Sequence, residues 1–377
     1  MRIARIIEYF PPHIGGMEGH GLNLSQEQIK LGHEVDVFIG YGGDLKSDFK
    51  DAPKSDSRIY KAPFQFLPLY SKIRRLWFNI WAYFTVKKNH KKNPYNIIHL
   101  HGDFAEAYFG GKLSKELNIP AILTIHAGLN KRLLKPKNAS CFKNIGKIIC
   151  VSEEIANDLK SIGISENKLA VISSGIHLSE FKEADRNKIT ALRSQYSKPI
   201  IISIGVLRPA KGFEYFIDAF KTVKKKFGMA NLIIIGDGPD RVELEKQAKK
   251  IGGIYFLGRQ SNDKIIEYLK TADVFALASI FMKGDREGTS NTIMEAMAAG
   301  IPVVTTNVGG SPYLIKDGVN GFIVNQGDSL ELANAIVKIL NDDELSQKIS
   351  AQNLEDIKEK DWPIIARKID EIYKSVF

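Results

Sequence analysis

Cysteine is nearly absent from this chain of 377 residues, which contains only Cys141 and Cys150. Two cysteines cannot form the disulfide framework of a small secreted domain, so we expect a reducing compartment. The sequence also contains no window of eighteen apolar residues, so we expect no transmembrane helix. The segment Met1–Glu8 is too short and too polar for a signal peptide, and we interpret it as a first strand.

Acidic residues are absent from one long stretch of the first half. Residues 57–102 contain nine Lys or Arg and no Asp or Glu, in a chain whose formal net charge is +10. Within this stretch, residues 69–92 repeat apolar and aromatic side chains at helical spacing, with basic residues at both ends. A helix of this kind can lie in the interface of an anionic membrane. The residues expected to contact the membrane are Lys72, Arg74, Arg75, Trp77, Trp81, Lys87 and Lys88.

The same pattern also fits a core helix with a solvated basic edge, and the two interpretations are compatible. Nucleic acid is disfavoured as a partner, because no nucleic-acid-binding module is recognisable. We therefore expect a cytoplasmic protein that is peripheral on the inner face of the membrane.

The length of the chain indicates two domains. Short apolar runs alternate with helical patterns in both halves, which predicts an α/β architecture of two doubly wound parallel sheets. The expected strands of the first half are Ile3–Ile7, Glu34–Ile39, Ile97–His101, Ala121–His126, Lys147–Val151 and Leu169–Ile172. Those of the second half are Ile200–Ile204, Asn231–Ile235, Ile254–Leu257, Val274–Ala278, Pro302–Thr306 and Gly321–Val324.

We expect one domain over residues 1–180, a linker over residues 181–198 and a second domain over residues 199–361. The final segment, residues 362–377, has a helical pattern. Ligands of doubly wound sheets bind at the carboxyl ends of the strands, so the loops that follow strands are the candidate site.

The most specific pattern of the sequence lies in residues 287–302. Ser290 and Asn291 are good N-cap residues for a helix that we expect over Thr292–Ala299, with Gly300 as its stop. The N-terminus of such a helix suits a phosphate. Glu287 precedes the helix, and Glu295 lies about one turn inside it, where a carboxylate can reach two neighbouring hydroxyls such as those of a ribose. The alternative is an ordinary amphipathic helix with one capping and one surface carboxylate.

The spacing of Glu287 and Glu295 resembles the E-x7-E motif of the retaining glycosyltransferases of family 4, which have the GT-B fold. The resemblance covers nearly the whole chain. It implies two Rossmann-like domains that face a cleft, an N-terminal one that binds acceptor and a C-terminal one that binds nucleotide sugar, with the last helix crossing back to the N-terminal domain. It also implies that Glu287 contacts the transferred sugar and Glu295 the ribose. Further donor contacts implied are Gly288, Thr289, Ser290 and Asn291.

Two features of the first half match the same family. The loop after the first strand contains Gly15 and Gly16, whose backbone can approach a ligand closely. By resemblance, this loop meets the donor diphosphate and the acceptor. His126 ends an expected strand and matches the family histidine that contacts the donor sugar, whereas His99 and His101 end the preceding strand and are weaker candidates.

Residues 205–212 resemble the G-R-L-x-x-x-K-G loop of the family. Lys211 matches directly, and Arg208 takes the place of the arginine that is usual at Val206. Two cations on one loop suit a diphosphate, because they neutralise the charge that grows on the leaving group. Gly258 and Arg259 follow a later strand and by resemblance border the nucleobase.

The segment Gly236-Asp237-Gly238 begins like a dinucleotide fingerprint, but Arg241 occupies the third glycine position. No acid lies near the end of the next strand, so NAD binding is not expected.

The sequence offers no conventional metal site. It contains no Asp-x-Asp pair, which the other large glycosyltransferase fold uses to hold a divalent metal, and no His/Cys cluster with zinc spacing. We therefore expect no metal and no cofactor, with the nucleotide sugar as a substrate.

Together these patterns predict a retaining, metal-independent glycosyltransferase. It would move a sugar from a nucleotide-sugar donor to a lipid-linked or surface-glycan acceptor, as in polysaccharide, O-antigen or glycolipid biosynthesis. Glu287, His126, Arg208 and Lys211 are the expected catalytic residues. The alternatives are a nucleotide-sugar epimerase or a phosphorylase on the same fold, and a non-catalytic scaffold of a membrane-associated glycan-assembly complex.

Overall fold

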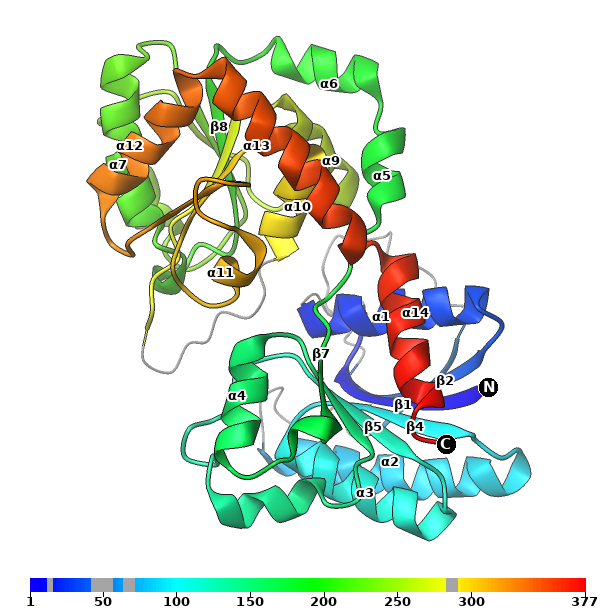
Figure 1. Cartoon of the computed structure of the whole chain (residues 1–377). Coiled ribbons are helices and arrows are strands. Elements are labelled where there is room, and N and C mark those ends of the chain that lie inside the picture. The colour runs from blue at the N-terminus through cyan, green and yellow to red at the C-terminus, as the bar shows by residue number, and fades with distance from the viewer. Residues whose placement is uncertain (12–15, 42–56, 64–71, 283–290) are drawn as a thin grey trace. The chain divides into compact units, whose positions relative to one another are not determined.

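The computed structural model describes residues 1–11, 16–41, 57–63, 72–282 and 291–377 (Figure 1). The chain divides into two compact units. Unit 1 consists of Met1–Gly175 together with Trp362–Phe377, and unit 2 consists of Ile176–Asp361. The boundary thus lies five residues before the expected end of the first domain, and the last helix belongs to unit 1.

Unit 1 is built on a parallel sheet of seven strands in the order β3-β2-β1-β4-β5-β6-β7. Its strands are β1 (Arg2–Tyr9), β2 (Glu34–Tyr41), β3 (Arg58–Lys61), β4 (Ile97–His101), β5 (Ala121–Ile125), β6 (Lys147–Cys150) and β7 (Leu169–Val171). Its helices are α1 (Gly16–Lys30), α2 (Lys72–Lys92), α3 (Phe104–Leu117), α4 (Glu153–Ser161) and α14 (Trp362–Lys374), with the 3-10 turns η1 (Pro136–Phe142) and η2 (Glu166–Lys168).

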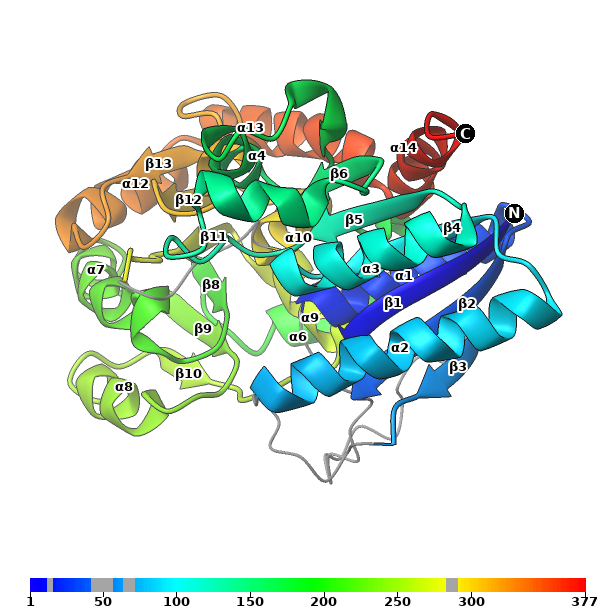
Figure 2. The ribbon, with the colours of Figure 1, turned by 90° about the horizontal axis from the view of Figure 1, so that it is seen from below.

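Two apolar layers cover the two faces of this sheet, because successive residues of a strand point to opposite faces. Ile3 and Ile7 of β1 belong to a core that they share with α1 and α14. Ala4 and Ile6 of the same strand belong to the opposite core, which they share with α2, α3 and α4. Helices α2 and α3 lie side by side over that face (Figure 2). The sheet is therefore buried on both sides, as in a doubly wound domain.

Unit 2 repeats this plan with a parallel sheet of six strands in the order β10-β9-β8-β11-β12-β13. Its strands are β8 (Ile200–Ile204), β9 (Asn231–Ile235), β10 (Ile254–Phe256), β11 (Val274–Leu277), β12 (Val303–Thr306) and β13 (Phe322–Val324). Its helices are α5 (Leu178–Glu183), α6 (Arg186–Arg193), α7 (Phe213–Lys226), α8 (Arg241–Ala248), α9 (Asn262–Thr271), α10 (Asn291–Ala299), α11 (Ser311–Leu314), α12 (Ser329–Leu340) and α13 (Asp343–Asp356), with η3 (Pro209–Lys211) and η4 (Ile357–Lys360).

The faces of the second sheet are again covered by separate cores. Helices α7, α8 and α12 pack on one face, and α5, α9 and α10 pack on the other. In β8, Ile201 points to the first core while Ile200 and Ile202 point to the second. The expected fold class, two doubly wound parallel sheets, is confirmed.

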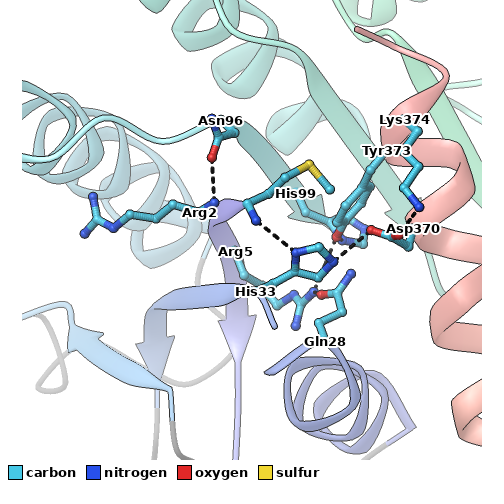
Figure 3. A network of polar contacts seen from close by, with 10 residues as sticks. Arg2, Arg5, Gln28, His33, Asn96, His99, Asp370, Tyr373 and Lys374 are labelled. Carbon is cyan, nitrogen blue, oxygen red and sulfur yellow. Dashed lines mark hydrogen bonds and ion pairs between the residues drawn. The ribbon is translucent and has the colours of Figure 1, made fainter. Parts of the chain in front are cut away.

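Helix α14 is attached to unit 1 by a polar network beneath its apolar face (Figure 3). Arg5 of β1 is fully buried and donates to the hydroxyl of Tyr373, as well as to Ser25 and Gln28 of α1. The same Tyr373 hydroxyl lies 2.6 Å from Nδ1 of His99. On the same side of the helix, Asp370 lies 2.8 Å from Nε2 of His33. These contacts join α14 to β1, β4 and α1, so the helix is an integral part of unit 1.

Several local expectations differ from the structure. Residues 181–198, expected as a linker, contain the end of α5 and all of α6, which packs against α9 within unit 2. Strand β3 was not expected, because its four residues have a mostly exposed, weakly apolar pattern. Strand β5 ends at Ile125, so His126 follows it.

The structure of helix α2 contradicts part of the expectation that its basic and aromatic residues contact a membrane. Arg74 is only 1% exposed and forms an ion pair of 3.0 Å with Glu8. Trp81 packs against the core, Arg75 pairs with Asp103 and Glu106 of the α3 region, and Lys87 pairs with Glu116. The exposed members of the expected set are therefore Lys72, Trp77 and Lys88. Across the described ranges, every helix is too short or too polar to span a bilayer.

Candidate active site

The segment that carries Arg208 and Lys211 follows β8 and is held by two neighbouring loops. Both side chains are half-buried, and Arg208 precedes the turn η3 that Lys211 ends. The next residue, Gly212, has φ +62°, and a Cβ there would lie 1.9 Å from the carbonyl oxygen of Ala278. The backbone amide of Ile280 donates to the carbonyl oxygen of Ala210 at 2.9 Å. Only glycine at 212 permits this close approach, which fixes the position of Lys211 beside the loop after β11.

The loop after β9 packs on the other side of the same segment. Gly236 has φ +136°, and a Cβ there would lie 1.9 Å from the carbonyl oxygen of Gly205. The amide of Leu207 donates to the carbonyl oxygen of Asp237 at 3.1 Å, which fixes the backbone just before Arg208. The resemblance of this loop to a dinucleotide fingerprint thus has a local explanation, because its glycines permit contact between two loops.

Gly258 and Arg259 continue this row of loops at the end of β10. Gly258 has φ +67°, and its carbonyl oxygen accepts from the amide of Gly236 at 2.8 Å. Arg259 is exposed. The loops that follow β8, β9 and β10 therefore touch one another at the carboxyl edge of the sheet, where a ligand of a doubly wound domain binds.

Glu295 lies in the second turn of α10 and is half-buried. Its Oε2 is buried and has no hydrogen-bond partner in the part of the chain that the structure describes. Burial raises the pKa of the Glu295 carboxyl to about 7, and the like charge of Glu180 on α5 raises it further in the same direction. A carboxylate with unused acceptor capacity is suited to bind hydroxyl groups.

The remaining residues of the expected motif are only partly described. Asn291 is the first residue of α10 and is exposed, and Gly300, with φ +73°, ends the helix as expected. Glu287, Gly288, Thr289 and Ser290 lie outside the described residues, as does Gly15. Gly16 is the exposed first residue of α1.

In unit 1, His126 belongs to a cluster of imidazoles. Its Nε2 lies 2.8 Å from Nδ1 of His101, which ends β4, and the two rings stack with centroids 5.1 Å apart. His20 of α1 packs edge-on against His126, with centroids 4.6 Å apart. Nδ1 of His20 lies 2.9 Å from Oγ of Ser174. His99 stacks behind His101, with both of its nitrogens bonded to Tyr373 and Thr124.

The cluster is electrically neutral near pH 7. Burial lowers the pKa of His126 to about 3 and lowers the pKa values of His20, His99 and His101 well below the usual range, with the buried Arg5 adding to the shift at these three. His126 thus acts as a neutral hydrogen-bonding group at its site.

Sequence reasoning identified His126 but missed His20 and the cluster as a whole. The sequence does place a histidine at the end of each of two consecutive expected strands. Because β4 and β5 are neighbours in the sheet, their carboxyl ends bring His101 and His126 together. The cluster does not show short zinc-type spacing, because the three histidines are separated by 81 and 25 residues along the chain.

Two units, each with a doubly wound parallel sheet and candidate site residues at its carboxyl edge, have the architecture of a glycosyltransferase of the GT-B type. Residues 14–180 match the family model named Glycosyltransferase Family 4, and residues 185–356 match the model named Glycosyl transferases group 1. The chain belongs to family 4 of the glycosyltransferases, and it is an enzyme of that class.

Relatives and solved structures extend over the full chain. An uncharacterized glycosyltransferase of Methanocaldococcus jannaschii is 29% identical, with 99% of this chain and 98% of the relative covered. A phosphatidyl-myo-inositol mannosyltransferase of Mycobacterium leprae is 26% identical, with 100% and 97% covered. The structure of Anabaena HepE in complex with UDP-glucose has a TM-score of 0.76 at 21% identity, covering all of both chains. A Rickettsia africae glycosyltransferase has a TM-score of 0.82 at 20% identity, with 100% and 98% covered.

Proposed function

We propose that this glycosyltransferase moves a sugar from a nucleotide-sugar donor to a lipid-linked acceptor at a membrane surface, with retention of configuration and without a metal ion in the reaction. The observation that carries the donor half of the proposal is the edge of the sheet in unit 2. Arg208 and Lys211 follow β8 there, and Glu295 offers an unsatisfied carboxylate oxygen on α10.

The proposed chemistry needs no protein nucleophile. The bond between the anomeric carbon and the donor phosphate breaks, and Arg208 and Lys211 stabilise the negative charge that develops on the phosphate. The acceptor hydroxyl attacks the same face of the sugar, and its proton passes to the departing phosphate. The neutral His126 contributes a hydrogen bond to the sugar, and Glu287 contacts the sugar as the family resemblance implies.

The donor is tested by a thermal-shift panel of UDP-, GDP-, ADP- and dTDP-sugars, with calorimetry and slow donor hydrolysis for each donor that stabilises the protein. We expect one base to be preferred and Glu295→Gln to weaken its binding by about 10-fold to 100-fold, because a hydrogen bond to a charged group contributes about 1.5–3 kcal/mol. If no donor stabilises the protein, the alternative function as a non-catalytic scaffold is favoured. The same alternative is favoured if a donor stabilises the protein but is neither hydrolysed nor used for transfer.

The pKa of Glu295 adds a sharper form of this test. A ribose needs the ionised carboxylate as acceptor, and a group with a pKa of about 7 is mostly protonated at pH 6 and mostly ionised at pH 8. We expect the donor to bind about tenfold more weakly at pH 6 than at pH 8. Glu180→Gln removes a like charge, so it should move this dependence to lower pH, and Glu295→Gln should abolish it. A pH-independent affinity in the unmodified protein would contradict the role of Glu295.

The acceptor half of the proposal rests on the outer face of α2. The apolar residues Ile73, Leu76, Trp77 and Phe84 are all exposed, with Trp77 at 47% and Phe84 at 63%. They recur at intervals of three, four and seven residues, which places them on one stripe of the helix. Phe78, Ala82 and Val86 are buried on the opposite side.

Basic residues accompany this stripe. Lys88 and Lys91 are exposed at the carboxyl end of α2, and Lys72 is exposed at its start. A helix that buries one face in its own domain and exposes apolar and basic side chains on the other is suited to an anionic bilayer. Two relatives whose names contain a phosphatidylinositol lipid fit this picture, a phosphatidyl-myo-inositol mannosyltransferase and a phosphatidylinositol N-acetylglucosaminyltransferase subunit.

Co-sedimentation with vesicles tests the membrane contact. We expect more protein to bind phosphatidylglycerol-containing vesicles than neutral ones, with the difference reduced by salt. The pair Trp77→Ser and Phe84→Ser should lower binding by about tenfold or more, since burying each ring is worth about 1.5–3 kcal/mol. Val242→Ser, which replaces an exposed apolar residue of α8 in unit 2, is the matched control and should leave binding unchanged. Equal recovery with both vesicle types would count against the proposal.

A further inference from the structure

Three histidines from three different elements converge at the carboxyl edge of the sheet in unit 1. His20 comes from α1, His101 ends β4, and His126 directly follows β5. Each can present one ring nitrogen to a shared point, and these three nitrogens lie within 4.8 Å of one another. Two nitrogens that bind one tetrahedral zinc ion are about 3.3 Å apart, as follows from bonds of about 2.0–2.1 Å. Small rotations of the rings would therefore bring all three nitrogens to a single ion.

The cluster also contains hydrogen-bonding capacity that the protein does not use. Nε2 of His20 and Nε2 of His101 are buried and have no hydrogen-bond partner among the described residues. His20 is only 2% exposed, and its other nitrogen is fixed by Ser174 at 2.9 Å. Buried polar atoms normally find partners, so buried imidazoles with unpaired nitrogens in a group of three histidines are suited to bind a ligand.

We propose that His20, His101 and His126 form a binding site for one divalent transition-metal ion of the zinc class, with Ser174 holding His20 in place. Imidazole nitrogens select Zn²⁺, Co²⁺, Ni²⁺ or Cu²⁺ over Mg²⁺ and Ca²⁺, which prefer oxygen ligands. Three protein ligands leave a fourth position open on a tetrahedral ion. A metal-bound histidine usually has its second nitrogen fixed by a hydrogen bond, which is the arrangement between His20 and Ser174.

The surroundings of the cluster limit binding. The guanidinium of Arg5 is buried behind the cluster and its positive charge opposes a dication. We therefore expect affinity in the micromolar range, weaker than that of a structural zinc site with thiolate ligands.

Occupation of this site would change the role of His126. A metal ion would bind one ring nitrogen of His126, which the proposed function uses as a neutral hydrogen-bonding group to the donor sugar, so a bound ion should inhibit transfer. This consequence rests on the proposed function, whereas binding of the ion does not. The proposed reaction itself stays free of metal, and the ion acts as an inhibitor that the N-terminal unit recognises.

Titration of metal-free protein with Co²⁺, followed by its visible absorption, tests the site, and equilibrium dialysis with Zn²⁺ gives the stoichiometry. We expect the intense bands of four-coordinate Co²⁺ and one Zn²⁺ per chain. Single variants His20→Gln, His101→Gln and His126→Gln should each weaken Zn²⁺ binding at least tenfold. Ser174→Ala should weaken it by about tenfold, because it loosens His20 without removing a ligand.

His90→Gln is the matched control, since His90 lies on α2 outside the cluster and should leave Zn²⁺ binding unchanged. Circular dichroism checks that each variant is folded, and the half-buried His126 is the position where a change disturbs packing least. The proposal is overturned if the protein gives no four-coordinate Co²⁺ bands, or if folded His126→Gln binds Zn²⁺ as tightly as the unmodified protein. Donor stabilisation without Zn²⁺ binding would remove this inference alone, whereas Zn²⁺ binding without any donor response would remove the proposed function alone.

Discussion

Replacing Lys211 by alanine should lower the turnover of sugar transfer by about 10²–10³, the range found when one preorganised group that stabilises developing charge is removed. The backbone next to Lys211 is held beside the loop after β11 by the contact of Gly212 with Ala278. Its charge stabilises the transition state, in which the phosphate departs, more than it stabilises the bound donor. We therefore expect kcat to fall more than KM rises. Steady-state kinetics with the donor found in the thermal-shift panel measures the effect. Arg208→Ala should give a loss of similar size.

Lys221→Ala on the exposed side of α7 is the matched control, because it removes the same charge from the same unit at a distance from the loop. Its turnover should stay within twofold of the unmodified protein, as expected for a screened surface charge. Arg208→Lys separates charge from geometry, since lysine keeps the charge but cannot bind a phosphate through two parallel hydrogen bonds. If Lys211→Ala and Arg208→Ala both transfer sugar at the normal rate, the assignment of the leaving-group site is wrong.

Trp362→Ala should destabilise unit 1 by about 3–5 kcal/mol, the usual cost of truncating a large aromatic side chain in a core. Trp362 begins α14, is 2% exposed, and packs edge-on against His20 at a centroid distance of 5.1 Å. The loss is a large share of the typical 5–15 kcal/mol that stabilises a domain. Denaturant unfolding followed by tryptophan fluorescence and by circular dichroism should show unit 1 unfolding at lower denaturant concentration.

The exposed aromatic residue of the same segment gives the control for this prediction. Phe377 is 70% exposed, so Phe377→Ala should change the free energy of unfolding by less than about 0.5 kcal/mol. Unit 2 has its own core, and its donor response should therefore persist in Trp362→Ala. Equal unfolding midpoints for Trp362→Ala and Phe377→Ala would show that α14 contributes little to unit 1.

The fold was predictable because its strands are short, apolar and separated by helical patterns. Ile200–Ile204 and Asn231–Ile235 were predicted with the bounds that the structure gives them, since parallel strands buried on both faces read as continuous apolar runs. Strand β3 was missed because an edge strand buries little, and its four residues carry two charges. The helices in residues 181–198 were not predicted, because most of their residues are polar and the apolar face is narrow. In α6, the buried residue of that face is Leu192.

The residues of the candidate site could be predicted where they belong to one short motif. They could not be predicted where the fold brings together residues that are far apart in the sequence. Lys211 and Glu295 could be assigned from neighbouring residues alone, and their roles stay predictions. The burial of Arg74 could not be inferred, because its partner Glu8 lies 66 residues away. The histidine cluster required knowledge that β4 and β5 end at the edge of the sheet where α1, which follows β1, begins.

The contribution of α14 to unit 1 has a consequence for synthesis of the protein on the ribosome. The first 175 residues emerge first, but the helix that covers Ile3 and Ile7 emerges only after all of unit 2. Translation at about 5–20 residues per second delays that helix by about 10–40 s. During this time, the apolar face of the first sheet has α1 but lacks α14 as a cover, while unit 2 folds. The nascent chain should therefore depend on a chaperone for its first-made half, and a chain terminated a few residues before Trp362 would expose that face permanently.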